Sequence, residues 1–353
     1  MKEYTITSND ADQRLDKFLK KLFPEASLSF LYSSNRKGKI KVVSQSQLSL
    51  NSLPLQGKEA TEKKIKGKKQ NIEYKLQAGE IVQIYLSDNE IEKISQKQEE
   101  KNFVEVDCNR PLQKKDIVFE DANILVLSKN AGQNVHPGDH KTTEVSLIDQ
   151  VHDYYQNTLD SLTFKPSLAH RIDRDTSGIL MIGKTKKTLT QLVADFKSHK
   201  KIQKTYFCLV LGKVSRNSGT IRKKLKRIEN AQRENKVQVS DSGQEAITHY
   251  KVIDEYTLKL PQGEQILSTL EVTIETGRMH QIRVHLQTLG NPILGDKAYG
   301  DKKLNSYFAK NYGITRQMLH AWKIQFLHPI TSKKMKLEAS LKKDMMKFIE
   351  KIK

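Results

Sequence analysis

The chain has 353 residues, enough for one large domain and a smaller one at roughly 100–200 residues per domain. Lys and Arg number 61 against 41 Asp and Glu, and the resulting net charge of +20 attracts polyanions, nucleic acid above all. Cys108 and Cys208 lie far apart without CxxC spacing, which excludes a disulfide framework and a cysteine zinc site. Residues 1–13 hold no apolar signal segment and the longest aliphatic run, Ile124 to Leu127, is too short to cross a membrane, so we expect a soluble, cytoplasmic protein.

The N-terminal part of the chain predicts two helices and several short strands. A helical period of apolar residues opens at Asp12, with a cap from Asn9 or Asp10. A second helix is expected at Leu28 to Arg36. Alternating apolar residues predict strands at 39–43, 72–76 and 81–86. Residues 44–62 have no sustained period and are interpreted as a loop insertion.

This arrangement resembles an S4 RNA-binding domain, which we place at residues 12–88. The resemblance lies in three stretches: Arg14-Leu15-Asp16-Lys17-Phe18-Leu19, Arg36-Lys37-Gly38-Lys39-Ile40 and Tyr74-Lys75-Leu76-Gln77-Ala78-Gly79-Glu80. It implies RNA contacts from Arg36 and Lys37. Residues 89–115 are nearly all polar and predict a charged, flexible linker.

Residues 116–353 predict one large α+β domain. Strand signals lie at 124–127, 179–182, 206–211, 248–253 and 267–274. Helical signals lie at 145–155, 189–199, 279–289 and 341–352. Because several strands follow one another with helices at the margins, we expect a mixed, largely antiparallel sheet rather than a doubly wound one.

Charged residues crowd the segment from Leu168 to Lys184. A His, two Arg and two Asp stand beside Thr176-Ser177-Gly178, and an apolar strand follows directly. Catalytic groups often occupy such loops, because a rigid strand fixes their geometry. From the residues alone, a polar turn whose Asp and Thr cap backbone groups is the more common explanation.

The stretch His170-Arg171-Ile172-Asp173-Arg174-Asp175-Thr176-Ser177-Gly178 resembles the signature motif of RluA-type RNA pseudouridine synthases. By position, the catalytic aspartate of that family corresponds to Asp173 and not to Asp175. The segment Lys204-Thr205-Tyr206 resembles the one that carries the family's active-site tyrosine, here Tyr206. In the similar segment 277–285, the basic residue that pairs with the carboxylate corresponds to Arg283. The resemblance covers about residues 117–340.

The resemblance implies the pseudouridine synthase fold and the isomerisation of specific uridines to pseudouridine, foremost in 23S large-subunit ribosomal RNA, without metal or cofactor. The reaction breaks the bond from sugar C1′ to base N1 and forms one from C1′ to C5. Asp173 either attacks C1′ or removes a sugar proton. An adjacent guanidinium from Arg283 favours the ionised carboxylate. The nucleotide must leave the stack, and Tyr206 suits the role of holding its base, although a core tyrosine is the simpler explanation without the resemblance.

Further RNA contacts are expected around the proposed site, from Arg171, His170, Arg278 and His280. Arg171 either fills the gap left by the flipped base or contacts a phosphate. The basic clusters at 197–204 and 222–227 either contact phosphates or are simply solvated faces.

The histidines at positions 280 and 285 do not predict a metal site. On a helix, five positions separate two side chains by about 140°, whereas an HExxH site needs both on one face. On the same helix we expect an apolar stripe of Met279, Ile282, Leu286 and Leu289. This stripe leaves Arg283 on another side, free to point at a site.

The expected partner is RNA, with the protein acting as a monomer. A transfer RNA pseudouridine synthase of the same family and a non-catalytic ribosomal RNA-binding or assembly factor are the alternatives. A glycoside hydrolase needs two carboxylates at least roughly 5 Å apart across a cleft, and Asp175 is too close to Asp173 on one turn. The S4-like segment and the block Tyr299-Gly300-Asp301 resemble the branch that modifies large-subunit ribosomal RNA.

Overall fold

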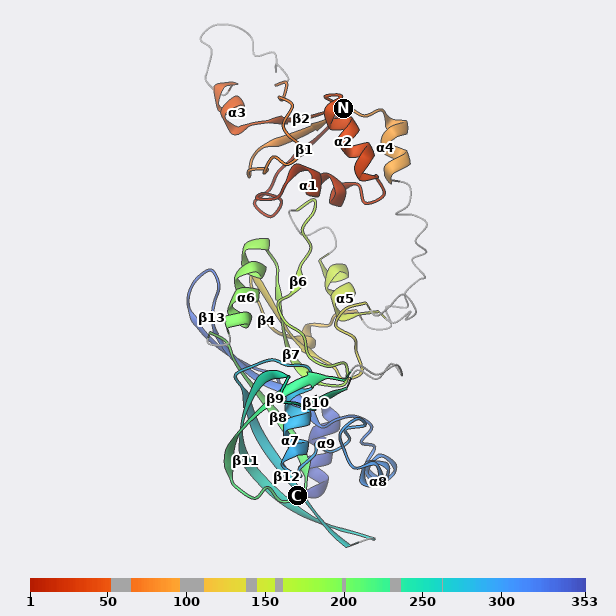
Figure 1. Ribbon diagram of the computed structural model, residues 1–353, viewed down its shortest axis with the longest axis vertical. Coiled ribbons are helices and arrows are strands. Elements are labelled where there is room, and N and C mark those ends of the chain that lie inside the picture. The colour runs from red at the N-terminus through yellow and green to blue at the C-terminus, as the bar shows by residue number, and fades with distance from the viewer. Residues whose placement is uncertain are drawn as a thin grey trace. The chain divides into compact units, whose positions relative to one another are not determined.

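The computed structural model describes residues 1–51, 65–95, 111–137, 145–155, 161–198, 201–228, 236–261 and 263–353. The chain divides into two compact units (Figure 1). The first consists of Met1–Asn109, Tyr155–Lys165 and Thr185–Lys187, and the second contains the rest of the chain. In these ranges no helix has the length and apolarity that a membrane span requires.

The first unit is a small antiparallel sheet with helices packed against it. Its strands run in the order β1-β3-β2, with β1 at Lys2–Thr5, β2 at Ile40–Val43 and β3 at Ile81–Ile84. Its helices are α1 (Leu15–Leu22), α2 (Leu28–Arg36), α3 (Gln45–Asn51) and α4 (Asp88–Ser95). Apolar residues at helical spacing on α1 join alternate residues of the strands in one core, because both periodicities present a single face.

Most elements predicted for this unit are confirmed. The two helices form as α1 and α2, and the first and last strands as β2 and β3. The prediction of a strand at 72–76 is wrong, because that segment forms only an isolated β-bridge between Lys75 and Arg14. The proposed cap is also wrong. The residue preceding α1 is Arg14, and Asp10 instead accepts a hydrogen bond from Thr7.

The first unit extends beyond the range 12–88 at both ends. Ile6 follows β1, and Ile91 and Ile94 lie on α4, and all three are buried in the same core. The segment predicted as a flexible linker therefore begins as a packed helix. The expected loop insertion at 44–62 is wrong at its start, where residues 45–51 form the helix α3. Residues 52–62 of the insertion and 96–110 of the expected linker lie outside the described residues.

The second unit contains a long sheet and the helices around it. Its strands are β4 (Ile117–Glu120), β5 (Ile124–Lys129), β6 (Ser167–Leu168), β7 (Ser177–Gly183), β8 (Gln203–Leu211), β9 (Ser218–Arg227), β10 (Val237–Val239), β11 (Gln244–Leu260), β12 (Gly263–Ile274), β13 (Leu319–Leu327) and β14 (Lys334–Glu338). Its helices are a short 3-10 turn η2 (Lys114–Asp116), α5 (Leu147–Tyr154), α6 (Lys186–Ser198), α7 (Gln281–Thr288), α8 (Lys302–Tyr312) and α9 (Lys343–Ile352).

The sheet is mixed and largely antiparallel, as predicted. Within the described residues its order is β10-β9-β11-β12-β8-β13-β7-β5-β4, with β14 beside β13 and β6 beside β7. The pairs are antiparallel except for β13 with β7, which are parallel and join His320 to Ser177 and Ala321 to Gly178. This parallel pair lies at the start of β7, directly after the charged turn.

Strand β8 shows how the two faces of the sheet are covered. Tyr206, Cys208 and Val210 pack in a cluster with Ile282 and Leu286 of α7. The intervening residues of β8 pack with α8 and α9 on the other face. Because side chains alternate along a strand, Tyr206 shares its face of the sheet with α7.

Predicted and observed elements of the second unit agree where the apolar pattern is strong. The five predicted strands form as β5, β7, β8, β11 and β12, and the four predicted helices as α5, α6, α7 and α9. Sequence patterns missed β4, β6, β9, β10, β13, β14 and α8. In β9 most side chains are exposed and basic, so the alternation that marks a half-buried strand is weak.

Candidate active site

A pocket of about 380 Å³ lies between the charged turn, β8 and the start of α7. Asp173, Tyr206 and Arg283, the three residues predicted as catalytic, all line it. The predicted RNA-contacting residues His170, Arg171, Arg278 and His280 line it as well. The pocket does not include Arg36 and Lys37, which are exposed at the end of α2 in the first unit.

The charged turn is anchored by strand β7, which comes directly after it. The backbone N–H of Thr176 donates to the carbonyl of Asp173, which closes the turn, and β7 begins at Ser177. Gly178 has φ 111, and a Cβ atom there would lie 2.2 Å from the carbonyl oxygen of Ala321. Only glycine permits this close approach of β7 to β13. The Ser177 hydroxyl is also 2.8 Å from His320 Nδ1.

A buried lysine holds the turn from the other side. Lys129, at the end of β5, is 1% exposed, and its Nζ donates to the carbonyls of Asn130, Gln133 and Arg174 at 2.7, 3.0 and 2.6 Å. Burial lowers the pKa of Lys129 to about 7, although Asp175 opposes that change. The three carbonyls match the three N–H donors of an ammonium group. Lys129 thus holds Arg174, the residue next to Asp173, through its backbone carbonyl.

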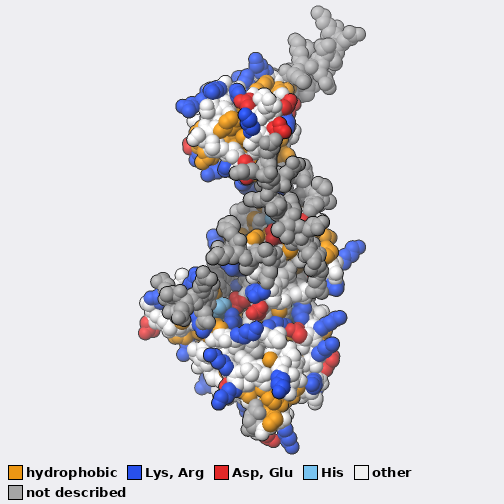
Figure 2. Space-filling model, turned by 90° about the vertical axis from the view of Figure 1, so that its right-hand side faces the viewer, with side chains coloured by type: hydrophobic (Ala, Val, Ile, Leu, Met, Phe, Trp, Pro, Cys, Tyr) orange, Lys and Arg blue, Asp and Glu red, His pale blue; other side chains and the backbone are white. Residues whose placement is uncertain are grey.

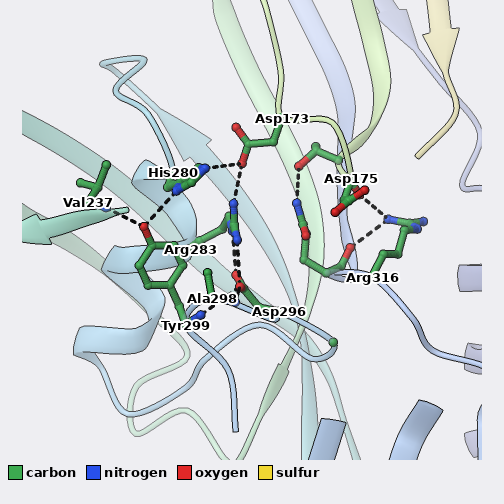
Figure 3. Close-up of polar contacts among 12 residues, drawn as sticks. Asp173, Asp175, Val237, His280, Arg283, Asp296, Ala298, Tyr299 and Arg316 are labelled. Atoms are coloured by element: carbon green, nitrogen blue, oxygen red, sulfur yellow. Dashed lines mark hydrogen bonds and ion pairs between the residues drawn. The ribbon is translucent and has the colours of Figure 1, made fainter. Parts of the chain in front are cut away.

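Arg283 links the turn to a second carboxylate. Its Nη1 donates to Asp173 Oδ2 at 3.0 Å, and its Nε and Nη2 donate to the two oxygens of Asp296 at 2.7 and 2.9 Å (Figure 3). Asp296 is fully buried and also accepts from the backbone N–H groups of Ala298 and Tyr299. Burial alone would lower the pKa of Arg283, but the two carboxylates raise it above its usual value. The guanidinium is therefore a fixed positive charge beside Asp173.

Asp173 and Asp175 face different surroundings. Asp173 lines the pocket, whereas Asp175 lines a separate hollow beside Arg316 and Lys342. Figure 3 shows Asp173 directed toward His280 and Arg283, and Asp175 beside Arg316. Arg283 binds Asp173 through Oδ2, and in the described part of the chain no residue hydrogen-bonds its Oδ1. This oxygen is the one available to a bound molecule.

Tyr206 projects from β8 beside the same carboxylate. It is 8% exposed, and burial, with a smaller effect of Asp173, raises the pKa of its hydroxyl, so the ring stays neutral. A neutral aromatic face in a pocket can stack against a base. The ring also packs against apolar residues of α7, so the core role considered from sequence is present together with the pocket-lining one.

The far wall of the pocket is cationic. Lys204 lies two residues before Tyr206 on the same face of β8, and its Nζ is 5.8 Å from the centre of the Phe196 ring. Burial lowers the pKa of Lys204 to about 8. Arg171, Lys197 and Arg278 also line this pocket, and Asp173 is the single carboxylate among the described residues that line it.

Contacts with Phe196 and Met181 fix the orientation of the His170 ring. Its ring lies 4.3 Å from that of Phe196, and its Nε2 accepts the backbone N–H of Met181 at 3.2 Å. Burial, reinforced by the charge of Lys204, lowers the pKa of His170 to about 3. The ring is therefore neutral, and any contact it makes with RNA is not a contact between opposite charges.

The segment before α7 differs from its prediction. The helix begins at Gln281, and His280 precedes it in the left-handed conformation, with φ 53. Met279 and Leu289 are exposed rather than part of an apolar stripe, and Ile282 and Leu286 are the buried members. His280 contacts Tyr299, whereas His285 contacts Thr248. Among the described residues no group of three or more His, Cys, Asp or Glu could hold a metal ion.

Sequence reasoning missed Asp296, Tyr299 and Lys129 as parts of this site. Asp296 follows the buried apolar residues Ile293 and Leu294. A carboxylate so close to buried residues is the sequence feature that could have identified Asp296 as part of the site. The block Tyr299-Gly300-Asp301 was noted as similar to the family, but Tyr299 was assigned no role. Lys129 ends the strongly apolar strand β5, which is an unusual place for a lysine.

Comparison with known proteins gives consistent similarities. Residues 123–288 match the family model described as RNA pseudouridylate synthase. The chain is 32% identical over 346 residues to the ribosomal large subunit pseudouridine synthase C of Vibrio vulnificus, covering 98% of this chain and 94% of that one. It is 35% identical over 236 residues to the ribosomal large subunit pseudouridine synthase D of Zymomonas mobilis, covering 65% and 70%. A human protein, RNA pseudouridylate synthase domain containing 4, shares the fold with a TM-score of 0.53 at 22% identity, covering 67% of this chain and 93% of that one.

Proposed function

The chain belongs to the RNA pseudouridylate synthase family, and we propose that it converts specific uridines of 23S large-subunit ribosomal RNA into pseudouridine, with Asp173 as the reacting carboxylate. The substrate is proposed because relatives matched over nearly the full chain are named for the large ribosomal subunit. The role of Asp173 rests on its place in the pocket and on its contact with Arg283 through Oδ2, which leaves Oδ1 without a hydrogen bond from any described residue.

The geometry suits chemistry at the sugar carbon C1′. Isomerisation breaks C1′–N1 and forms C1′–C5, while C5 gives up its proton and N1 takes up a proton from water, so atoms and charge balance without oxidant or reductant. A carboxylate beside C1′ either attacks it or removes a sugar proton. Arg283 places a positive charge beside this carboxylate, and it is itself held in place by Asp296.

Tyr206 supplies a surface for the displaced base. A uridine in a stack cannot reach a carboxylate inside a pocket, so it must be flipped out at a cost of a few kcal/mol. Tyr206 lies next to Asp173 in the pocket, and stacking on its ring offsets part of that cost. Arg171 is exposed at the pocket and is placed to fill the gap in the RNA or to contact a phosphate.

The charge distribution suits an RNA partner. Figure 2 shows Lys and Arg side chains spread over the visible face of both units, where they outnumber the acidic ones. The exposed basic residues of β9 and the cluster at 197–204, of which 199 and 200 lie outside the described residues, supply further phosphate contacts. We also propose that the first unit is an S4-like RNA-binding domain, at which Arg36 and Lys37 contact RNA. A second tethered contact raises the effective concentration of the target.

The substrate is tested by mapping pseudouridines chemically in cells. Ribosomal and transfer RNA are compared from strains with the gene, without it, and with Asp173→Asn. We expect sites in 23S ribosomal RNA to disappear in both of the last two strains. Loss confined to transfer RNA would overturn the substrate, and no change in any strain would favour a non-catalytic RNA-binding factor.

The titration of Lys204 gives a prediction for RNA affinity. The ammonium is charged below its pKa of about 8 and neutral above it, so one phosphate contact is lost as the pH rises from 7 to 9. We expect weaker binding of RNA at pH 9. The slope of log K against log salt concentration should become shallower by about 0.7–0.9 for each lost contact. Filter binding at several salt concentrations measures both, and Lys204→Met should abolish the pH effect. An equal pH effect in wild type and Lys204→Met would contradict the assignment.

A further inference from the structure

His280 and Tyr299 form a polar pair beside the proposed catalytic carboxylate, with no role assigned by the family resemblance. The Tyr299 hydroxyl is 2.8 Å from the backbone N of Val237 and 2.9 Å from His280 Nδ1 (Figure 3). The other ring nitrogen, His280 Nε2, is 3.8 Å from Asp173 Oδ2. The three side chains thus lie in a row that ends at Asp173.

The position of each proton in this row follows from which atoms can donate a hydrogen bond and which can accept one. The N–H of Val237 can only donate, so the Tyr299 oxygen accepts it. Burial raises the pKa of Tyr299, so the phenol keeps its proton. In the described part of the chain His280 Nδ1 is the acceptor within reach of that proton. If Nδ1 carried the proton instead, the buried Tyr299 O–H would have no acceptor, which is costly.

A neutral His280 whose Nδ1 accepts must carry its proton on Nε2. Burial lowers the pKa of His280, and the nearby Arg283 charge adds to this, although Asp173 opposes it. The Nε2–H therefore faces Asp173 Oδ2, the same oxygen that Arg283 holds. At 3.8 Å the contact is longer than a hydrogen bond, and such contacts commonly shorten when substrate binds.

The backbone supports a specific role for this histidine. His280 has φ 53, a conformation that is costly for residues other than glycine and persists where the surroundings determine it. The buried side chain of Gln281 fixes the turn, accepting from Thr276 Oγ1 and the N–H of Arg278 while donating to the Ile247 carbonyl. The His280 ring packs edge-on against the Tyr299 ring, with centres 5.6 Å apart.

We propose that Tyr299 and His280 are positioning residues for Asp173. The Tyr299 hydroxyl selects the Nε2–H form of His280, and this N–H together with Arg283 holds Oδ2, so that Oδ1 is presented to the sugar. This rests on the proposed role of Asp173. His280 then acts on the carboxylate and not, as expected from the sequence, on the RNA.

The tautomer can be measured without any activity. In protein labelled with ¹⁵N-histidine, long-range NMR correlations distinguish a protonated from a bare ring nitrogen, and the signals missing in His280→Gln identify residue 280. We expect Nδ1 bare and Nε2 protonated in the wild type, and a mixture of both forms in Tyr299→Phe. A wild-type ring protonated at Nδ1 would overturn the proposal even if Asp173 is catalytic.

The effect on Asp173 is measured by single-turnover rates on unmodified ribosomal RNA. His280→Gln keeps an N–H near the position of Nε2, whereas His280→Leu has similar size and no donor, and both place an ordinary side chain in the strained conformation. We expect about a 10- to 100-fold lower rate for Leu, at unchanged RNA affinity, and at least partial recovery for Gln. Equal rates for the two variants would show a purely structural role and sink the idea.

Two controls separate this proposal from the proposed function. Tyr256→Phe removes a hydroxyl that bonds Asp254 and does not line the pocket, so its rate should equal that of the wild type. Asp173→Asn tests the catalytic role of Asp173 itself. If Asp173→Asn is fully active, that proposed role fails, whereas the NMR result on His280 still stands or falls independently.

Discussion

Asp173→Asn is expected to reduce pseudouridine formation by at least about 10⁴-fold, because Asn has neither the charge nor the basicity that chemistry at C1′ needs. Asn keeps the volume of Asp, and Arg283 keeps its bidentate pair with Asp296, so the fold should persist. Asp173 is 28% exposed at its side chain, and we expect stability to change by less than about 1 kcal/mol. Release of tritium from RNA labelled at C5 of uridine measures the reaction, since forming C1′–C5 displaces that hydrogen.

The matched control is Asp175→Asn on the same turn. Asp175 does not line the pocket, and its carbonyl rather than its carboxylate contacts Arg316. We expect its rate to remain within about threefold of the wild type. If the two variants lost activity equally, the choice between the two aspartates would be wrong.

Asp296→Asn is expected to destabilise the protein by about 3–5 kcal/mol, because it removes the charge that compensates a buried guanidinium. Asp296 is fully buried, Arg283 is 7% exposed, and the partial contact of Arg283 with Asp173 does not replace a bidentate pair. The amide of Asn would also place N–H donors against the donors of Arg283. Urea unfolding, followed by circular dichroism, measures the change.

The comparison for this variant is an exposed ion pair. Lys213 and Glu255 are 3.3 Å apart, with the Lys213 side chain 66% exposed. Glu255→Gln should therefore cost no more than about 1 kcal/mol. If Asp296→Asn unfolds at a urea concentration as high as Glu255→Gln does, the buried pair of Arg283 and Asp296 does not stabilise the fold.

Local patterns were enough for the elements whose apolar residues follow a regular strand or helix period. Strand β8 alternates between two cores, and α1 repeats its apolar residues at helical spacing, so both were predicted. The start of α7 was predicted two residues early. The spacing of apolar residues fits a helix that includes His280, and this spacing does not reveal the backbone conformation of His280. A left-handed residue leaves no trace in periodicity.

The site itself depends on contacts that no spacing reveals. Asp173 and Arg283 are 110 positions apart, and their pairing was expected from the family resemblance alone. Asp296 is fully buried, against the usual tendency of aspartate to stay in water, because a guanidinium and two backbone N–H groups satisfy it. Burial of a charge depends on partners supplied by the tertiary fold, so sequence reasoning did not assign it a role.

Because β7 pairs in parallel with β13, the proposed active site is completed late in the synthesis of each polypeptide. Ser177 and His320 are 143 positions apart, and a contact of such high order forms only after a large loop has closed. Synthesis proceeds from the N-terminus, so the turn bearing Asp173 emerges long before Arg283, Asp296 and β13 are translated. A nascent chain therefore carries its carboxylate without the framework that orients it. The ribosome making the enzyme, whose RNA belongs to the proposed class of substrate, is not exposed to the assembled site until β13 has been translated.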